Sequence, residues 1–146
     1  VEPTMLRRTA HVPGPRLISE RTSATMRALM RQVVTRGTAS MAEVEGFAFG
    51  GKTGTADKPD ERGGYARDRV LATFAGAFPM NDPRYVIVVT LDEANETSSG
   101  AARRTAGWTV VPVAAEIVRR TAPLLGLRPQ SEAESMGAIE AALRLR

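Results

Sequence analysis

At residues 50–56 the chain reads Gly-Gly-Lys-Thr-Gly-Thr-Ala, which places one cation and two hydroxyl groups among three glycines. Lys52 carries a compact charge with three donors that can hold a carboxylate or influence a neighbouring hydroxyl. Thr53 and Thr55 add their hydroxyl groups, and Gly54 lets another backbone come close because it has no Cβ. Together these residues suit an anionic, peptide-like ligand that lies along an extended strand.

The same region also fits the nucleotide-binding P-loop pattern, Gly-x4-Gly-Lys-Thr, over residues 46–53. The apolar run at 86–92, which ends in Asp92, could then be the strand that carries the acidic residue of such a site. A P-loop, however, needs a buried strand before its first glycine and a helix that starts at the lysine. Residues 40–45 do not read as a buried strand, and the composition of residues 54–59 opposes a helix. The sequence therefore favours a strand at 46–56 over a phosphate-binding loop.

The residues before this strand predict a helix. Ser19 is a suitable N-cap, and the helix is expected to end near Arg36, with Gly37 at its C-cap. Its core face is predicted from the i, i+3, i+4 spacing of Met26, Leu29, Met30, Val33 and Val34. Residues 38–45 are then expected to form a loop that leads into the strand.

Two further strands are predicted after residues 46–56. One is expected at 70–78 and the other at 85–91, with a turn at 81–83 between them. The run at 85–91 is uninterrupted and rich in β-branched residues, so we expect it to be buried on both faces. The charged and glycine-rich residues 57–69 predict a mobile loop between the first two strands.

A second helix is predicted at residues 109–125 from the spacing of its apolar residues, and it should cover the sheet. Trp108 is expected to be a packing residue at its start. Ser131 and Glu134 match a capping box, which predicts a short last helix to Leu145. This order of elements predicts an α+β fold in which an antiparallel three-stranded meander is covered by helices.

The composition excludes several classes of site. Hydrophobic residues make up 42% of the 146, which is enough for a core, and no apolar run approaches a membrane span. With no cysteine and a single histidine, His11, the chain cannot build a thiolate or multi-histidine metal site or a Ser-His-Asp triad. We therefore expect no metal and no cofactor. The basic residues are mostly arginines scattered as pairs with few aromatics between them, which favours solvated faces over nucleic-acid binding.

Four short motifs follow one another in an order that resembles one enzyme family. They are Arg36-Gly37-Thr38-Ala39, the Lys-Thr-Gly stretch at 50–56, Phe74-Ala75-Gly76-Ala77-Phe78-Pro79 and Asp82-Pro83-Arg84-Tyr85. In this order they resemble the C-terminal part of the transpeptidase domain of a class B, monofunctional penicillin-binding protein, closest to the cell-division type. The resemblance covers roughly residues 1–129 and implies the penicillin-binding and serine β-lactamase-like fold. Residues 130–146 form a tail outside it.

The resemblance implies a peptidoglycan D,D-transpeptidase that cross-links cell-wall stem peptides through an acyl-serine intermediate and is acylated by β-lactams. It implies catalytic roles for Lys52, Thr53 and Gly54, and substrate binding by Lys52, Thr53 and Thr55, with the Thr55 backbone N–H as an oxyanion donor. The substrate would add along the strand as an extra β-strand, for which Gly54 leaves room. Simple alternation puts Lys52 and Thr55 on opposite faces, so a twisted or bulged strand is expected.

The nucleophile of this family is missing from the sequence. Neither Lys52 nor Lys58 has a serine three residues before it, and neither Asn81 nor Asn95 has one two residues before it. Ser-x-x-Lys and Ser-x-Asn are therefore absent, and we expect the N-terminal remainder of the same enzyme to carry the serine. The other partners implied by the resemblance are stem peptides, β-lactams and other cell-division proteins, at the periplasmic face of the bacterial inner membrane.

Two other functions fit the same strand. A serine β-lactamase or a β-lactam sensor shares the Lys-Thr-Gly motif. A non-catalytic peptide-binding scaffold would keep the edge of the strand and lose the chemistry. A Ser-x-x-Lys motif upstream, together with an N-terminal membrane helix and a non-catalytic pedestal domain, would favour the transpeptidase.

Overall fold

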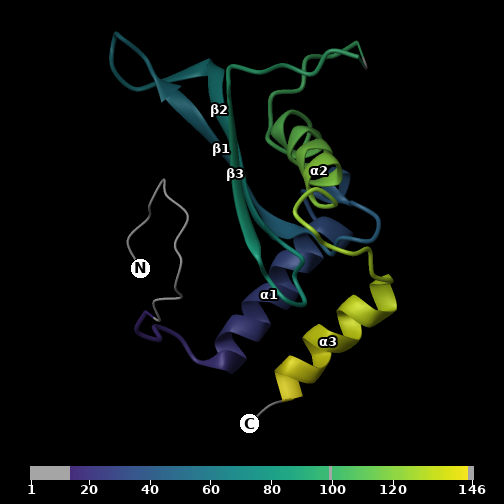
Figure 1. The fold of residues 1–146 in the computed structure, drawn as a ribbon. Helices are drawn as coiled ribbons and strands as arrows, with labels where there is room; N and C mark the ends of the chain where they lie inside the picture. The colour runs from purple at the N-terminus through teal and green to yellow at the C-terminus, as the bar shows by residue number, and fades with distance from the viewer. Residues whose placement is uncertain (1–13, 99, 145–146) are drawn as a thin grey trace.

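In the computed structural model, which describes residues 14–98 and 100–144, helices cover one side of an antiparallel sheet (Figure 1). The sheet has three strands in the order β1-β2-β3, so the predicted α+β meander is confirmed. The elements in chain order are α1 (Glu20–Thr35), the 3-10 helix η1 (Ser40–Ala42), β1 (Gly50–Pro59), β2 (Tyr65–Phe78), β3 (Tyr85–Asp92), α2 (Val110–Thr121) and α3 (Glu132–Arg144). His11 lies outside the described residues.

The strand β1 excludes the P-loop. It begins at Gly50 and continues through Lys52 as an extended strand, so no helix starts at the lysine. Its register with β2 places Lys52 opposite Ala75 and Thr53 opposite Phe74, without a shift between Gly50 and Asp57. Because a P-loop must curl around a phosphate, a regular ladder at these residues leaves no place for one. The first predicted strand therefore exists, but it starts four residues later than expected.

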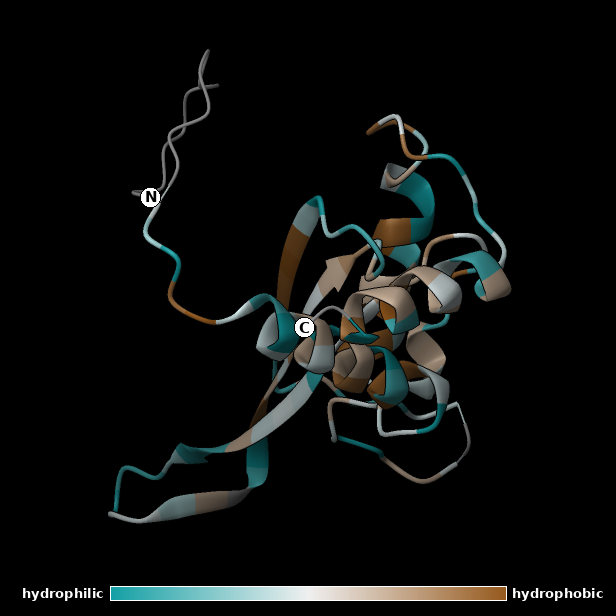
Figure 2. Cartoon of the chain, turned by 90° about the horizontal axis from the view of Figure 1, so that it is seen from below, coloured by the Kyte–Doolittle hydropathy of each residue, from teal (hydrophilic) through white to brown (hydrophobic). Residues whose placement is uncertain are grey.

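The predicted mobile loop at 57–69 is mostly strand. β1 runs to Pro59 and β2 begins at Tyr65, so the two strands form a long hairpin whose turn is residues 60–64. The hairpin extends away from the helices, and its tip is hydrophilic (Figure 2). Most of the described side chains at 57–69 are exposed, so no apolar pattern is needed, and the strands pair at Asp57–Val70 and again at Pro59–Tyr65, with an irregularity between these two pairs. Lys58 adds ion pairs to Asp92 at 2.8 Å and Glu93 at 2.7 Å. Mobility of this hairpin stays a prediction.

The prediction that residues 85–91 are buried on both faces is wrong. Side chains of β3 alternate between partly buried and exposed, and Val86 and Val88 are 80% and 64% exposed. Ile87 and Val89 point the other way and pack against the core. A β-branched run indicates a strand but not how many of its faces are covered, and the described helices cover only one.

The core lies between the sheet and α2. Phe49 is fully buried and meets Phe74 and Phe78 edge-on, with ring centroids 5.3 and 5.8 Å apart. Gly76 makes room for this ring, because a Cβ there would lie 2.7 Å from it. The helix α2 supplies an apolar stripe of buried residues, Val110, Val111, Ala114, Ala115 and Val118. Burying this stripe against the sheet holds α2 in place.

The helix α1 begins as predicted, and its predicted core face is correct only in part. The Ser19 hydroxyl accepts from the Thr22 N–H at 3.0 Å, which confirms the N-cap. Met26 and Leu29 of the predicted core face are half exposed, at 49% and 50%. Val34 is buried as predicted, and Met30 and Val33 pack against the core, but Ala24 and Arg31 are buried as well. The helix ends with Arg36 as its C-cap, one residue before the predicted Gly37.

Two short helices complete the fold. α2 is shorter than predicted, because turns take over after Ala122. The capping box that starts α3 is confirmed, since the Ser131 N–H donates to Glu134 at 2.8 Å and the Glu134 N–H donates to Ser131 at 3.3 Å. None of the helices within residues 14–98 and 100–144 is long and apolar enough to cross a membrane.

Acid is expected to weaken the start of α3 through Glu134. The Ser131 hydroxyl and backbone N–H donate to the Glu134 carboxylate and hold its pKa below the ordinary value of 4.5. A lowered pKa in the folded state means that the stabilisation is complete above the ordinary value and is lost as the pH falls through the lowered one. Glu134→Gln should therefore lower the melting temperature near neutral pH, with a difference from wild type that shrinks on acidification. Thermal melts across the acid range check this, and a difference that persists at the acid end would contradict it.

Candidate substrate-binding strand

The structure brings Lys52 and Thr53 together on β1. The Lys52 Nζ donates to the Thr53 carbonyl oxygen at 2.7 Å and lies 3.5 Å from the Thr53 Oγ1. In the described sheet, β1 is an edge strand, with β2 as its one neighbour. A cation and a hydroxyl therefore lie close together on a strand whose other edge is open to pairing.

The strand has no bulge between Lys52 and Thr55, where the sequence predicted a twist or a bulge. The register of β1 is regular from Gly50 to Asp57, so Thr53 and Thr55 share the face of Phe74, and Lys52 starts on the opposite face. The long lysine stem folds back on its own strand and carries its amine to Thr53. A flexible side chain thus replaces the backbone distortion that alternation suggested.

Two loops hold the threonines from the helix side of the sheet. The Thr38 and Thr53 hydroxyls are 2.8 Å apart, and the Thr55 hydroxyl accepts from the Ala106 N–H at 3.0 Å. Gly107 allows the loops to meet, because a Cβ there would lie 2.6 Å from the Thr38 carbonyl oxygen. The loop after α1 and the segment before α2 therefore fix the two hydroxyls that the sequence predicted as substrate-binding.

A cavity of about 480 Å³ opens beside these threonines. It is lined by Gly37, Thr38, Ser40, Met41, Thr53, Thr55, Thr105, Ala106, Gly107 and Trp108. Trp108 is 43% exposed, and the Arg103 guanidinium carbon lies 3.8 Å from the centre of its ring, a cation–π contact. Trp108, which was expected to be a packing residue, thus packs against Arg103 just before α2 and also lines this cavity.

Several residues of this region were not predicted as site residues. Thr38 belongs to the motif Arg36-Gly37-Thr38-Ala39. Because this motif comes directly before the Lys-Thr-Gly motif in the family that the sequence resembles, it could have identified Thr38 as a site residue. Ala106 acts through its backbone N–H, which no side-chain pattern reveals. Arg103 lies between loop residues without periodicity, so only the folded chain brings it to Trp108.

The space that a side chain at position 54 would occupy is empty, whereas the corresponding space at Gly50 and Gly51 is filled by other atoms. A Cβ at Gly54 would have the Thr73 carbonyl oxygen as its nearest atom, at 4.0 Å. A Cβ at Gly51 would lie 2.5 Å from the Ala75 carbonyl oxygen. The packing of the described residues therefore requires a glycine at 51 but not at 54, and the space over Gly54 is free for a ligand or another segment.

A larger cavity, of about 1030 Å³, lies away from this strand. It is lined by residues of α1, residues 43–48 and the start of the tail, and it includes none of Lys52, Thr53 and Thr55. We take the smaller cavity as the candidate site because two of the predicted residues, Thr53 and Thr55, line it, whereas Lys52 is not among its lining residues and reaches only Thr53. Size alone carries no chemistry. Among the described residues, no three acidic or histidine side chains gather as a metal site would require.

The chain has relatives among known protein sequences. The family model of the penicillin binding protein transpeptidase domain matches residues 1–117. The probable peptidoglycan D,D-transpeptidase FtsI of Caulobacter vibrioides is 36% identical over 127 residues, which are 82% of this chain and 22% of that protein. Stage V sporulation protein D of Bacillus subtilis is 33% identical over 125 residues, 86% of this chain and 18% of that protein. The chain thus spans about a fifth of the length of the curated relatives it matches.

Solved structures share the fold. The transpeptidase domain of Burkholderia pseudomallei penicillin-binding protein 3 has a TM-score of 0.70 at 37% identity, over 86% of this chain and 37% of that chain. Penicillin-binding protein 3 of Mycobacterium tuberculosis, complexed with ampicillin, has a TM-score of 0.68 at 33% identity, over 84% of this chain and 28% of that chain. Family model, relatives and fold agree, and the chain belongs to the transpeptidase domain family of FtsI-type class B penicillin-binding proteins.

Proposed function

We propose that this chain supplies the substrate-holding strand of a peptidoglycan D,D-transpeptidase, and that the serine nucleophile lies on the remainder of the enzyme. One observation carries the proposal. The Lys52 amine and the Thr53 hydroxyl meet on an edge strand in a chain of the transpeptidase family. The names of the relatives support the reaction, since the Caulobacter protein is called a probable peptidoglycan D,D-transpeptidase.

Each predicted residue has a role in this proposal. Lys52 attracts the terminal carboxylate of the stem peptide and belongs to the proton network of the serine. Thr53 and Thr55 donate hydrogen bonds to the same carboxylate. The Thr55 backbone N–H stabilises the oxyanion, and one such donor typically contributes about 3 kcal/mol to the transition state. Gly54 leaves room for the substrate to pair with the edge of β1 as an extra strand.

The reaction proceeds by acyl transfer. The serine oxygen attacks the carbonyl between the two terminal D-alanines, and the last D-alanine leaves with the proton that the serine gave up. The amine of a neighbouring stem peptide then attacks the acyl-serine and forms the cross-link. A β-lactam enters the first step and stays attached to the serine, as the ampicillin complex of the Mycobacterium tuberculosis relative suggests.

The setting of the enzyme follows from the same family. We place it at the periplasmic face of the bacterial inner membrane, where peptidoglycan is cross-linked, with a membrane anchor outside this chain. The FtsI-type relatives favour a role in cell division and contacts with other cell-division proteins.

A substitution at Gly54 tests the docking of the substrate. In the complete enzyme that contains this chain, Gly54→Val should slow acylation by a fluorescent penicillin at least tenfold, because the branched side chain occupies the space where the ligand backbone approaches. The melting temperature should hardly change, since the described residues leave that space empty.

The matched control is Ala56→Val, on the same face of β1 and exposed. It should acylate at the wild-type rate. If Gly54→Val were acylated as fast as wild type, the docking of substrate along β1 would be wrong. If it lost stability instead, the glycine would serve packing against the remainder of the enzyme.

A further inference from the structure

A buried arginine links the tail of the chain to the start of β1. Arg31 of α1 is 2% exposed, and its Nη1 donates to the Phe49 carbonyl oxygen at 2.9 Å. Its Nε and Nη2 donate to the two carboxylate oxygens of Glu132 at 3.3 and 2.6 Å. The Nη2 also donates to Glu43 at 2.9 Å. One guanidinium therefore joins α1, the loop before β1, the last residue before β1 and the first residue of α3.

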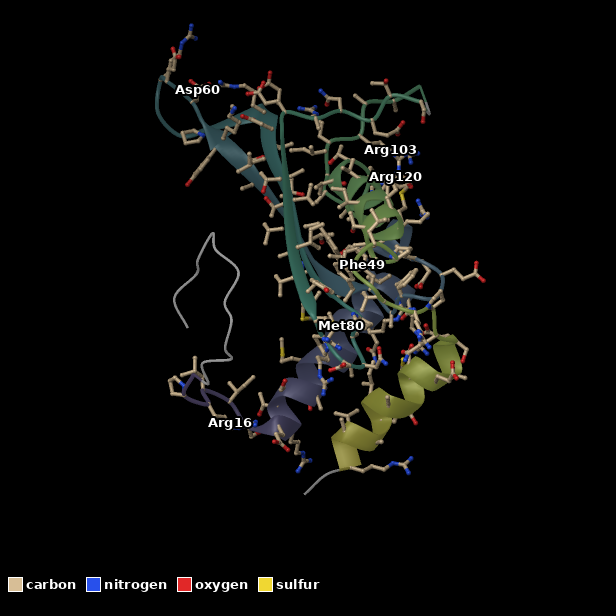
Figure 3. All side chains as sticks on the ribbon, in the orientation of Figure 1. Arg16, Phe49, Asp60, Met80, Arg103 and Arg120 are labelled. Carbon is tan, nitrogen blue, oxygen red and sulfur yellow. The ribbon has the colours of Figure 1, made fainter. Side chains whose placement is uncertain are left out.

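The contact between Arg31 and Phe49 lies where β1 begins. Phe49 immediately precedes Gly50, and a Cβ at Gly50 would lie 3.0 Å from the Arg31 backbone nitrogen and 2.7 Å from the Met80 side chain. The strand therefore starts in direct contact with α1. Figure 3 shows Phe49 and Met80 at this lower part of the sheet. The direction in which residues 50–55 extend therefore depends on the contacts at this junction between α1 and the start of β1.

The tail holds the same junction at further points. The Gln130 N–H donates to the Gly46 carbonyl oxygen at 2.9 Å, and the Asn81 side chain donates to the Gln130 side chain at 2.7 Å. Ile139 of α3 is fully buried in a cluster with Ala48 and Met80. The helix α3 therefore packs beside α1 (Figure 1) and braces the segment that leads into the Lys-Thr-Gly strand.

The charge of Arg31 makes its partners necessary. Burial lowers the pKa of Arg31, but the hydrogen bonds that Arg31 donates to Glu43 and Glu132, together with their negative charges, outweigh burial and raise the pKa above its ordinary value. A buried cation without such partners is strongly disfavoured. Glu132 gives the two-pronged grip that suits a planar guanidinium, and so it sets the orientation of Arg31.

We propose that α3 is a positioning element for the Lys-Thr-Gly strand, in which Glu132 orients Arg31 and Arg31 fixes the Phe49 carbonyl at the start of β1. The family model ends at residue 117, so this role belongs to a part of the chain that the family match does not include. The inference rests on the proposed transpeptidase function. Arg31 and Glu132 are positioning residues, since they touch neither Lys52 nor Thr53.

A small change at this junction is expected to reach the site. Lys52 lies three residues after Phe49, about 10 Å along an extended strand. A tilt of the strand at its start therefore moves the amine and the two hydroxyls relative to a serine held elsewhere. Misplacement by about 1 Å in an active site can cost as much as a hundredfold in rate.

The test separates the rate of acylation from the amount of competent enzyme. In the complete enzyme, Glu132→Gln replaces one carboxylate oxygen with an amide N–H₂. This group is a donor, so it cannot accept the hydrogen bond that Arg31 donates there. Stopped-flow acylation by a fluorescent penicillin at saturating concentration should then be about tenfold slower, while the final amount of adduct per protein equals that of wild type. Simple destabilisation would lower the final amount and leave the rate of the folded fraction unchanged.

The matched control is Glu140→Gln, which makes the same change at an exposed position of α3 and should acylate at the wild-type rate. Glu132→Asp keeps the negative charge on a shorter side chain, so its acylation should be slowed less than that of Glu132→Gln. If Glu132→Gln does not fold, Glu132→Asp takes its place in the test. A wild-type rate in both Glu132 variants, or a loss of amount alone, would overturn the positioning role. A wild-type enzyme that forms no adduct would instead overturn the proposed function, and the inference with it.

Discussion

Replacing Lys52 by alanine in the complete enzyme is expected to slow acylation by penicillin at least tenfold without loss of the fold. The Lys52 amine makes a charge-assisted contact in the site and none with the core, since it reaches only the Thr53 carbonyl and hydroxyl. Removing such a hydrogen bond costs about 2 kcal/mol or more, which corresponds to this loss in rate. Stopped-flow acylation and a thermal melt of the same sample measure both effects.

Lys52→Arg provides the graded comparison. It should also be impaired, though less than Lys52→Ala, because a planar guanidinium does not replace a compact charge in a tight site. If Lys52 were only an edge-strand lysine that discourages aggregation, neither variant would change the rate of acylation. Acylation of Lys52→Ala at nearly the wild-type rate would therefore refute the catalytic role.

The second large effect is expected from Phe49→Ala, which should lower the free energy of unfolding of the transpeptidase domain by about 3–5 kcal/mol. The ring is fully buried and meets both Phe74 and Phe78 edge-on, so its removal leaves a cavity in the centre of the core. Denaturant unfolding measures the change. Tyr65→Ala is the matched control, because Tyr65 is 73% exposed on the hairpin and should change the stability little. A loss below about 1 kcal/mol for Phe49→Ala would show that the core collapses around the gap.

The order of the elements could be predicted because each carries a local signal. The spacing of apolar residues in α2, the capping residues of α1 and α3 and the β-branched run of β3 all act within a few residues. The exposed face of β3 could not be predicted, since Val86 and Val88 look like core residues until the layers of the fold are known. The length of the hairpin was missed because the pairs that extend it, Asp57–Val70 and Pro59–Tyr65, join residues without an apolar period.

The inward face of α1 was hidden by its central residue. Arg31 counts as polar in any hydropathy pattern, so the apolar spacing left it out of the inward face and included the half-exposed Met26 and Leu29. The burial of Arg31 depends on carboxylates 12 and 101 residues away in the sequence, which the local pattern cannot contain.

The residues predicted for the site could be named from the motif alone, and their roles stay predictions. Lys52, Thr53 and Gly54 carry their chemistry in the motif itself, and the structure places the first two in contact. The contacts that Thr53 and Thr55 make come from loops 15 and 51 residues distant, at Thr38 and Ala106. Such loop contacts follow from the packing of α1 and α2 and have no periodic signal.

The most direct test of the central claim is to map the penicillin adduct on the complete enzyme by mass spectrometry of its peptides. Residues 1–146 are proposed to hold the substrate through β1 and to lack the nucleophile. The adduct should therefore be found on a single serine outside these residues, in a Ser-x-x-Lys sequence. An adduct within residues 1–146, for example on Ser40, which lines the cavity beside Thr53 and Thr55, would contradict this division of roles.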